Sequence, residues 1–331
     1  MIDPWLERAD AARTALEADG RSYIYAQLRA GGPEWLPRGP VLVHTSGTTG
    51  EPVPFELEPA RVEAQARGAW TALGLSDDER WLCPLPLTHV GGLMVLLRSF
   101  VHGTTAIVGG LERLADATVA SLVPTQLVRL LDAGTPAPDA LILLGGAPAG
   151  RALLERARAA GWRVAPSYGL TQACSSVTIA EPGDVETYGR RIPGVSVEIA
   201  PDGEILVRGS TVAGTLRTGD LGRLDPDGRL IVTGRKRELV ITGGENVAPA
   251  EVEAALLAHP AVVEAGVFGR PDPEWGEALT AHVVLRAPAT PEELRGFCAQ
   301  RLPGFKVPKA VEVVDALPRT ASGKLLRREL A

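Results

Sequence analysis

Four hydroxyl side chains and two glycines lie close together in the sequence, directly after an apolar run at residues 41–44. A glycine-rich turn after a strand can aim successive backbone N–H groups into one concavity, and neighbouring hydroxyls add further donors. Such a turn suits phosphate oxygens, although the Lys-Ser/Thr ending of a Walker A loop is absent. A polar surface turn is the alternative for this segment by itself. The residues are Thr45, Ser46, Gly47, Thr48, Thr49 and Gly50.

The segments around this loop alternate between strand-length apolar runs and helical patterns as far as about residue 180. This alternation is typical of an α/β domain. Farther on, Pro-Asp-Gly twice separates alternating apolar strands, at 195–209 and 222–234, which predicts antiparallel hairpins. The strands expected in the first part are 41–44, 105–110, 120–123 and 140–146, and the helices are 59–74 and 150–161.

The C-terminal part has the pattern of a small α+β unit. A helix is expected at 249–258, strands near 262–268 and 280–285, and a further helix after Thr290, which forms a capping box with Glu293. The apolar positions of that last helix share one face and are Leu294, Phe297, Cys298 and Leu302. The boundary is expected near Gly234–Arg237. We therefore predict a large α/β domain with an antiparallel β region at 1–236 and a small α+β domain at 237–331.

Composition narrows the possible partners. A chain of 331 residues with 45% hydrophobic residues can bury a full core, and its net charge of -6 argues against a nucleic-acid or anionic membrane surface. Cys83, Cys174 and Cys298 are odd in number and far apart, so neither a disulfide framework nor a zinc site is expected. The N-terminus lacks the pattern of a signal peptide, and no apolar run reaches membrane-spanning length. We expect a cytoplasmic protein.

Five segments, in order, resemble the adenylate-forming superfamily, which includes acyl-CoA synthetases, luciferase-like enzymes and peptide-synthetase adenylation domains. They extend over most of the chain, from Val41 to Leu330. They are TSGTTGEP (45–52) for the phosphate loop, SYGLTQ (167–172) for adenine and metal, RTGDLGRLD (217–225) for ribose, GRKRELVITGGENVAPAEVE (234–253) for the hinge and glycine loop, and PRTASGKLLRREL (318–330) for the catalytic lysine.

The resemblance implies ATP, Mg²⁺ and coenzyme A as the cofactors. Tyr168 offers a flat face for adenine, Asp220 can accept from both ribose hydroxyls, and Arg235 can donate to the sugar or the α-phosphate. As isolated residues they would be a core tyrosine, a hairpin aspartate and a solvated arginine. The other implied positions are the phosphate loop, Gly145, Gly146, Ala147, Gly169, Thr171 and Gln172 for the nucleotide, Thr48 and Gln172 for the metal, and Gly243, Gly244 and Trp275, with Phe305 and Lys309, for CoA.

The implied reaction has two steps. A carboxylate attacks ATP to give an acyl-adenylate and pyrophosphate, and a thiol then displaces AMP. Lys324 is expected to stabilise the charge that develops at the α-phosphate; a solvated lysine in a basic tail is the alternative. The resemblance also implies that the small domain is mobile and rotates at Arg237 between two poses, one presenting Lys324 and the other the Gly243-Gly244 loop.

Two residues depart from the superfamily pattern. Val53 stands where a lysine usually follows the phosphate loop, and Gln172 stands where a glutamate is usual. The first change removes a positive charge near the phosphates, and the second removes an anionic partner of Mg²⁺, although glutamine keeps a carbonyl oxygen. We expect weaker binding of ATP or Mg²⁺ rather than inactivity. The phosphate loop also follows only 44 residues, and a homodimer could cover the surface that this leaves exposed.

Within the superfamily, the segments 85–103, 121–131 and 143–148 most resemble short forms of the o-succinylbenzoate:CoA ligases of menaquinone biosynthesis. That acid is aromatic and has two carboxylates, so its pocket needs an apolar slot and a donor set for the carboxylate that does not react. The candidates are His89, Arg98, Gln126, Ser167 and Thr171 for polar contacts and Val90 and Leu93 for the slot. His89 is also expected to be a catalytic or gating residue, in addition to Lys324.

Two other functions are compatible with the sequence. The chain could be a CoA ligase for another aryl or fatty acid, because the pocket residues decide the substrate. It could also be a non-catalytic relic that only binds nucleotide. The retention of Lys324, Asp220 and Arg235 argues against the relic, since binding alone does not require the distant lysine.

Overall fold

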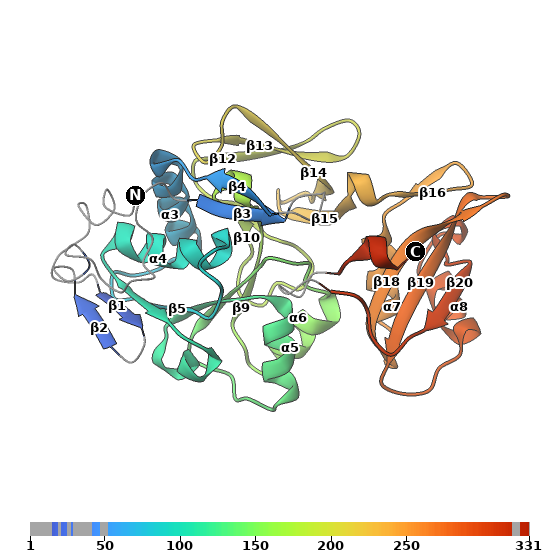
Figure 1. Cartoon of the computed structure of the whole chain (residues 1–331), viewed down its shortest axis with the longest axis horizontal. Coiled ribbons are helices and arrows are strands. Elements are labelled where there is room, and N and C mark those ends of the chain that lie inside the picture. The colour runs from blue at the N-terminus through green and yellow to red at the C-terminus, as the bar shows by residue number, and fades with distance from the viewer. Residues whose placement is uncertain are drawn as a thin grey trace.

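The computed structural model describes residues 15–18, 21–24, 28, 42–46, 52–319 and 325–330. Figure 1 shows a larger part followed by a smaller C-terminal part. The helices are α3 (Pro59–Leu73), α4 (Val90–His102), α5 (Pro124–Asp132), α6 (Arg151–Ala159), α7 (Pro249–Leu257) and α8 (Pro291–Ala299). Short 3-10 helices are η1 (Leu111–Asp116), η2 (Thr171–Ala173), η3 (Lys236–Glu238), η4 (Gly304–Lys306) and η5 (Arg327–Glu329).

The large sheet has a parallel centre and antiparallel margins. Its order is β11-β10-β9-β8-β7-β5-β6-β1-β2, with parallel pairing from β9 through to β1 and antiparallel pairing at β9–β10, β10–β11 and β1–β2. The strands predicted at 105–110, 120–123 and 140–146 are confirmed as β6, β7 and β8. The strands are β1 (Ala15–Ala18), β2 (Arg21–Ile24), β5 (Arg80–Cys83), β6 (Thr105–Val108), β7 (Val119–Leu122), β8 (Leu141–Leu144), β9 (Val164–Leu170), β10 (Ser175–Ile179) and β11 (Arg190–Arg191).

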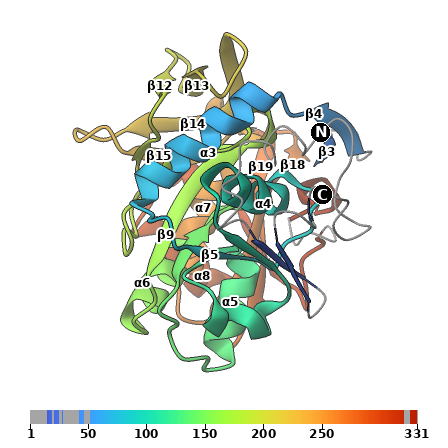
Figure 2. The same cartoon turned by 90° about the vertical axis from the view of Figure 1, so that its left-hand side faces the viewer.

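Both faces of the parallel centre of the large sheet are buried, because helices cover each of them. Successive strand residues point to opposite faces. On β8, Leu141 and Leu143 join the core cluster that contains α3 and α4, whereas Ile142 and Leu144 join the cluster that contains α5 and α6. Figure 2 shows these helix pairs around the strands. This two-sided burial explains why the parallel strands are continuous apolar runs rather than alternating ones.

An antiparallel sheet of order β12-β13-β14-β15 packs on the α3 side of the larger part. Its strands are β12 (Val195–Ile199), β13 (Glu204–Gly209), β14 (Thr215–Leu224) and β15 (Leu230–Arg235). Both hairpins predicted from Pro-Asp-Gly are confirmed, since β12 pairs with β13 and β14 pairs with β15. Gly203 and Gly228 close these turns with φ of 83° and 76°, a left-handed conformation that favours glycine.

The apolar run predicted at 41–44 is β3 (Leu42–Ser46), which pairs with β4 (Pro52–Glu56) as a separate antiparallel hairpin. The Val43 side chain is buried in the same core cluster as α3. The β3–β4 hairpin therefore belongs to the α3 side of the fold rather than to the parallel sheet.

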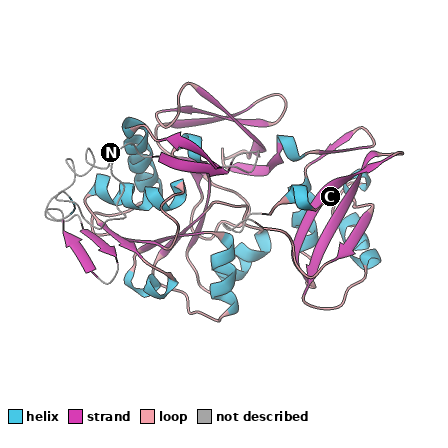
Figure 3. Ribbon diagram, viewed as in Figure 1, coloured by secondary structure: helices cyan, strands magenta, loops and turns pink. Residues whose placement is uncertain are grey.

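The C-terminal part is an α+β unit, as predicted. Its sheet has the order β17-β16-β19-β18, with β20 parallel to β19, and Figure 3 shows the helices packed beside these strands. The capping box is confirmed, because the Thr290 side chain accepts from Glu293 N and Glu293 accepts from Thr290 N. Leu302 lies beyond the end of α8 but packs against the same core. The strands are β16 (Val240–Thr242), β17 (Glu245–Val247), β18 (Val262–Asp272), β19 (Gly276–Leu285) and β20 (Ala310–Val313).

Together, these parts confirm the predicted fold class of a large α/β domain with an antiparallel β region and a small α+β domain. Cys83, Cys174 and Cys298 are free and buried. Within the described ranges, no helix is long and apolar enough to cross a membrane.

Candidate active site

Tyr168, Asp220 and Arg235 meet where β9 approaches the antiparallel sheet. The hydroxyl of Tyr168 donates to Asp220 Oδ2 at 2.8 Å, and Arg235 Nε lies 3.1 Å from Asp220 Oδ1. Asp220 and Arg235 are cross-strand partners on β14 and β15. The backbone pairing thus aligns two of the predicted ribose-binding groups, and the fold brings the predicted adenine residue to them from 52 positions away.

Burial keeps the hydroxyl of Tyr168 protonated. Tyr168 is 8% exposed and Asp220 is 7% exposed. Desolvation by burial, followed by the negative charge of Asp220, raises the pKa of Tyr168 above its ordinary value. The hydroxyl therefore remains a donor, and Asp220 can accept hydrogen bonds with its remaining lone pairs.

The predicted glycine turn lies beside the end of β9. Gly145 N donates to Leu122 O, and the Ser167 hydroxyl donates to Leu144 O at 3.1 Å. A Cβ on Gly145 would lie 2.9 Å from the Ser167 hydroxyl oxygen, and Gly146 has a φ of 80°. Glycine therefore suits both positions, because a Cβ on Gly145 would displace the Ser167 hydroxyl and the φ of Gly146 is left-handed. Ser167 uses its hydroxyl to hold this turn.

A turn with unusual backbone geometry follows the Tyr168 motif. Gln172 is exposed in η2, and the next residues Cys174 and Ser175 have φ of 57° and 109°, which is uncommon for residues other than glycine. Arg98 Nη2 donates to the Ser175 hydroxyl at 3.1 Å. The strained turn is therefore fastened to α4 beneath it.

Arg98 lies inside the fold, where it is 1% exposed. Its Nε and Nη2 both donate to Gln65 Oε1, at 3.2 and 3.1 Å, and its guanidinium lies 5.2 Å from the ring centroid of Trp81. Burial lowers the pKa of Arg98 to about 9. The predicted substrate cation is thus surrounded by protein groups. Gln65 was not predicted as a partner of Arg98, although a polar residue at an apolar position of α3 could have indicated such a role.

The remaining substrate candidates lie at the carboxyl ends of the parallel strands. His89 is exposed at the N-cap of α4, Val90 begins that helix, and Leu93 is buried within it. Gln126 Oε1 accepts from Val123 N, and Gln126 Nε2 donates to Pro84 O. The Gln126 amide therefore ties α5 to the end of β5 rather than standing open. Thr171 is half-buried beside Gln172.

The residues predicted to bind CoA lie in the C-terminal part, where Gly243 and Lys309 each contact Trp275. Gly243 N donates to Trp275 O at 2.9 Å, and a Cβ on Gly243 would lie 3.1 Å from the Trp275 ring. Lys309 Nζ lies 3.8 Å from the centroid of that ring. Phe305, which is close to Lys309 in the sequence, lies on η4 and is 38% exposed. In Figure 1 the β16–β17 turn with Gly243 and Gly244 points away from β9, whereas η5 lies on the side facing the larger part.

Several predicted positions lie outside what the structure describes. These are Gly47, Thr48, Thr49, Gly50 and Lys324, together with the side chains of Thr45, Ser46 and Val53. Among the described residues, no three His, Cys, Asp or Glu side chains cluster as a metal site. Gln172 offers an exposed amide oxygen next to the adenine motif, which fits a hard cation that is otherwise bound by phosphates and water.

Family comparisons cover both parts of the chain. The model of the AMP-binding enzyme family matches residues 39–216, and that of the AMP-binding enzyme C-terminal domain matches 251–324. The 2-succinylbenzoate--CoA ligase of Bacillus subtilis (strain 168) is 37% identical over 329 residues, covering 87% of this chain and 68% of its own length.

Solved structures of o-succinylbenzoate coenzyme A synthetase (MenE) from Bacillus subtilis are also similar. The complex with the acyl-adenylate intermediate OSB-AMP has a TM-score of 0.79, 37% identity and coverage of 87% of this chain and 68% of that one. The complex with ATP and magnesium ion has a TM-score of 0.79, 37% identity and coverage of 87% and 69%. A double mutant bound with the product analogue OSB-NCoA has 38% identity and coverage of 87% and 68%, but a TM-score of 0.57.

Proposed function

The chain belongs to the AMP-binding enzyme family, and on that basis we propose that it is the AMP-forming ligase that joins 2-succinylbenzoate to coenzyme A. It uses ATP with Mg²⁺, and it makes an acyl-adenylate before the thioester. The observation that carries the proposal is the buried cluster of Tyr168, Asp220 and Arg235. Asp220 supplies an acceptor, Arg235 a donor and Tyr168 an aromatic ring, which together suit the ribose and adenine of a bound adenosine.

In the first step, a carboxylate oxygen of the acid attacks the α-phosphorus, and the bond to the pyrophosphate oxygen breaks. We assign adenine stacking to Tyr168, ribose binding to Asp220, and donation to the sugar or α-phosphate to Arg235. Lys324 would offset the negative charge that develops at the α-phosphate. Thr48 and Gln172 would hold Mg²⁺, which would neutralise charge on the phosphates.

In the second step, the CoA thiolate attacks the acyl carbonyl, and AMP leaves with the electron pair of the broken acyl–oxygen bond. We assign the Gly243-Gly244 turn and Trp275 to the approach of the CoA chain and nucleotide, with Lys309 able to pair with phosphate once it leaves the Trp275 ring. The exposed Phe305 would stack on the nucleotide.

We propose that Arg237 is the hinge between domains 1–236 and 237–331. Two observations support this. The last strand of the antiparallel sheet ends at Arg235, and the first strand of the C-terminal sheet begins at Val240. At equal coverage of this chain, the TM-score falls from 0.79 for the OSB-AMP complex to 0.57 for the OSB-NCoA complex, as a different arrangement of two rigid parts would produce.

For the acid, we propose that Val90 and Leu93 line the apolar side and that His89 and Thr171 offer polar contacts. Ser167 can only accept a bond there, because its hydroxyl donates to Leu144 O. Arg98 supplies positive charge from beneath rather than through a direct contact, because it is buried and bonded to Gln65. Gln126 shapes the site through Pro84.

The decisive experiment is mass spectrometry of reactions that contain the protein, ATP, Mg²⁺, CoA and a panel of acids led by 2-succinylbenzoate. Formation of 2-succinylbenzoyl-CoA and AMP in preference to other thioesters is expected. A thioester formed only from another aryl or fatty acid would keep the mechanism and change the substrate. Absence of AMP with every acid would contradict the enzyme assignment and favour the nucleotide-binding relic.

We further propose a homodimer. Among the described strands, β2 lies at one edge of the large sheet, and an edge strand is a place where a second chain can pair. Light scattering after size exclusion should give about twice the chain mass of 34.8 kDa. A monomeric mass at micromolar concentration would contradict this part of the proposal.

A further inference from the structure

Arg327 lies in the C-terminal tail, three residues after Lys324, and every nitrogen of its guanidinium has a protein acceptor. Nη1 and Nη2 form a fork on the carboxylate of Glu253, with Nη2 3.3 Å from Oε2. Nε donates to Glu238 Oε2 at 3.1 Å, and Nη1 also donates to Val267 O at 2.5 Å. Such bidentate, charge-assisted bonds fix both the position and the orientation of an arginine.

The partners of Arg327 come from separate segments of the C-terminal part. Glu253 is on α7, Val267 is on β18, and Glu238 ends η3. Glu253 is itself held, because its Oε1 accepts from Val267 N at 2.8 Å. The side chains are 20% exposed for Arg327, 14% for Glu253 and 29% for Glu238. Burial alone would lower the pKa of Arg327, but Glu253 and Glu238 outweigh it and raise that pKa.

The tail is anchored on the other side of Lys324 as well. Arg319 donates to Glu264 Oε2 from Nε at 3.1 Å and from Nη2 at 2.6 Å, and it forms a β-bridge with Leu325. Leu326 N donates to Pro318 O at 2.9 Å. The segment that contains Lys324 therefore starts and ends at the same place on the C-terminal sheet.

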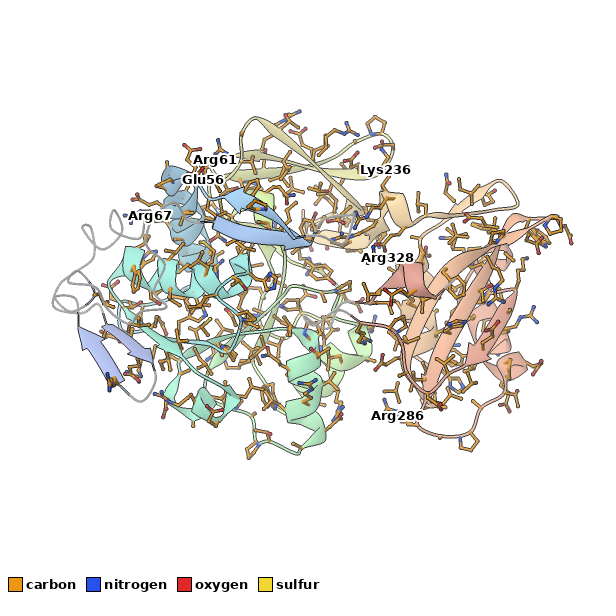
Figure 4. The ribbon with its side chains drawn as sticks, in the orientation of Figure 1. Glu56, Arg61, Arg67, Lys236, Arg286 and Arg328 are labelled. Atoms are coloured by element: carbon orange, nitrogen blue, oxygen red, sulfur yellow. The ribbon has the colours of Figure 1, made fainter. Side chains whose placement is uncertain are left out.

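The segment η3 connects this anchor to the larger part. At its start, Lys236 Nζ lies 2.6 Å from Asp202 Oδ2 and 3.3 Å from Glu204 Oε2, both near the β12–β13 turn. At its end, Glu238 is bonded to Arg327. Arg237 is the residue between them. Figure 4 shows Lys236 above the space between the two parts and Arg328, next to Arg327, at the edge of that space.

We propose that Arg327 is a positioning residue for adenylation, which joins the segment carrying Lys324 to α7, to β18 and to the residue that follows the hinge. This inference rests on the proposed function, because it assigns Arg327 to the adenylation step, in which we place Lys324. The tail and the post-hinge residue then move as one body when the domain rotates, so that the residues on either side of Lys324 keep one position relative to the hinge. The thioester step uses the Gly243-Gly244 turn, to which Arg327 makes none of these bonds.

The test measures the two half-reactions separately in Arg327→Met, which keeps the apolar stem and removes the guanidinium. Adenylation is followed as pyrophosphate release, and thioester formation is followed from supplied acyl-adenylate and CoA. Misplacing a catalytic group by about 1 Å can cost roughly 100-fold, so kcat for adenylation should fall about 10- to 100-fold. Thioester formation should change less than about twofold. The matched control is Arg286→Met, which removes an exposed arginine after β19, at the far lower edge of the same part (Figure 4), and should leave both rates unchanged.

A mutant cycle with Lys324→Ala tests whether Arg327 acts through the lysine. If it does, the double variant will adenylate no more slowly than Lys324→Ala alone, because nothing remains to be positioned. If the rate losses of the two single variants multiply in the double variant, the inference is wrong. It is also wrong if Arg327→Met slows both half-reactions equally. If Lys324→Ala by itself leaves adenylation unchanged, the catalytic role of the lysine is wrong, which is a separate failure.

Glu238→Gln provides a milder variant in case Arg327→Met does not fold. It keeps the shape of the side chain and weakens a single bond to Arg327. Adenylation should fall severalfold relative to thioester formation. An unchanged ratio of the two rates in this variant would also overturn the inference.

Discussion

Tyr168→Phe is the most direct test of the nucleotide site, because it removes one oxygen atom and keeps the aromatic ring. The hydroxyl that is lost donates to Asp220 Oδ2 at 2.8 Å within a buried environment. Asp220 keeps its contact with Arg235 at 3.1 Å. The variant therefore loosens the carboxylate without removing it or the surface that we assign to adenine.

The size of the effect follows from the type of bond. A hydrogen bond to a charged acceptor contributes about 1.5–3 kcal/mol, so a loss of about 2 kcal/mol of unfolding free energy is expected. For a domain of this size class, that corresponds to a fall in Tm of roughly 4–8 °C. If about 1 kcal/mol of this orientation energy also serves ribose binding, KM for ATP should rise about fivefold. The value of kcat should change little, because stacking and ribose contacts bind substrate and transition state alike.

The assay combines thermal unfolding with steady-state AMP formation over a range of ATP concentrations. Tyr188→Phe is the control, because Tyr188 is partly buried and its oxygen only accepts a longer bond of 3.3 Å from the neutral Ala149 N–H. Its Tm should fall by about half as much or less. A Tyr168→Phe protein with unchanged Tm and unchanged KM for ATP would refute the view that this hydroxyl orients Asp220.

Three further predictions concern single side chains. His102 stacks on Trp70 with ring centroids 4.1 Å apart, and burial, then the charge of Arg67, lowers the pKa of His102 to about 4. Between pH 6.5 and 4, the unfolded chain therefore binds a proton at this histidine that the folded chain does not bind. The free energy of unfolding falls as the pH falls through this window. His102→Phe should show a smaller drop in Tm from pH 7 to 5 than the parent protein. Thr290→Ala removes a cap bond of 3.2 Å to the backbone and should cost about 1 kcal/mol in unfolding free energy with no change in kcat. Gln172→Glu adds an anionic oxygen at an exposed position and should lower the Mg²⁺ concentration needed for half-maximal AMP formation, and an unmoved Mg²⁺ requirement would contradict its assignment to the metal.

The local elements of this protein could be predicted from its sequence alone. The Pro-Asp-Gly turns, the Thr290 capping box and the alternation of apolar runs with helices were all read correctly. Each depends on interactions among a few residues that are neighbours in the sequence, so their conformational preferences follow from the residue types alone. The ordered motifs also identified the family, because five short patterns in one order leave few alternatives.

The contacts of the functional side chains, by contrast, could not be predicted from the sequence and depend on the whole fold. Arg98, expected from the sequence to face substrate, is instead bonded to Gln65, 33 residues away, and Gln126 is bonded to backbone. Tyr168 meets Asp220 across 52 residues, and Arg327 meets Glu253 across 74. Such contacts depend on the order of strands in a sheet and on the direction in which each side chain leaves its element. Local preference does not encode either of these, so only the folded chain shows which of the predicted residues stand open to substrate and which hold the others in place.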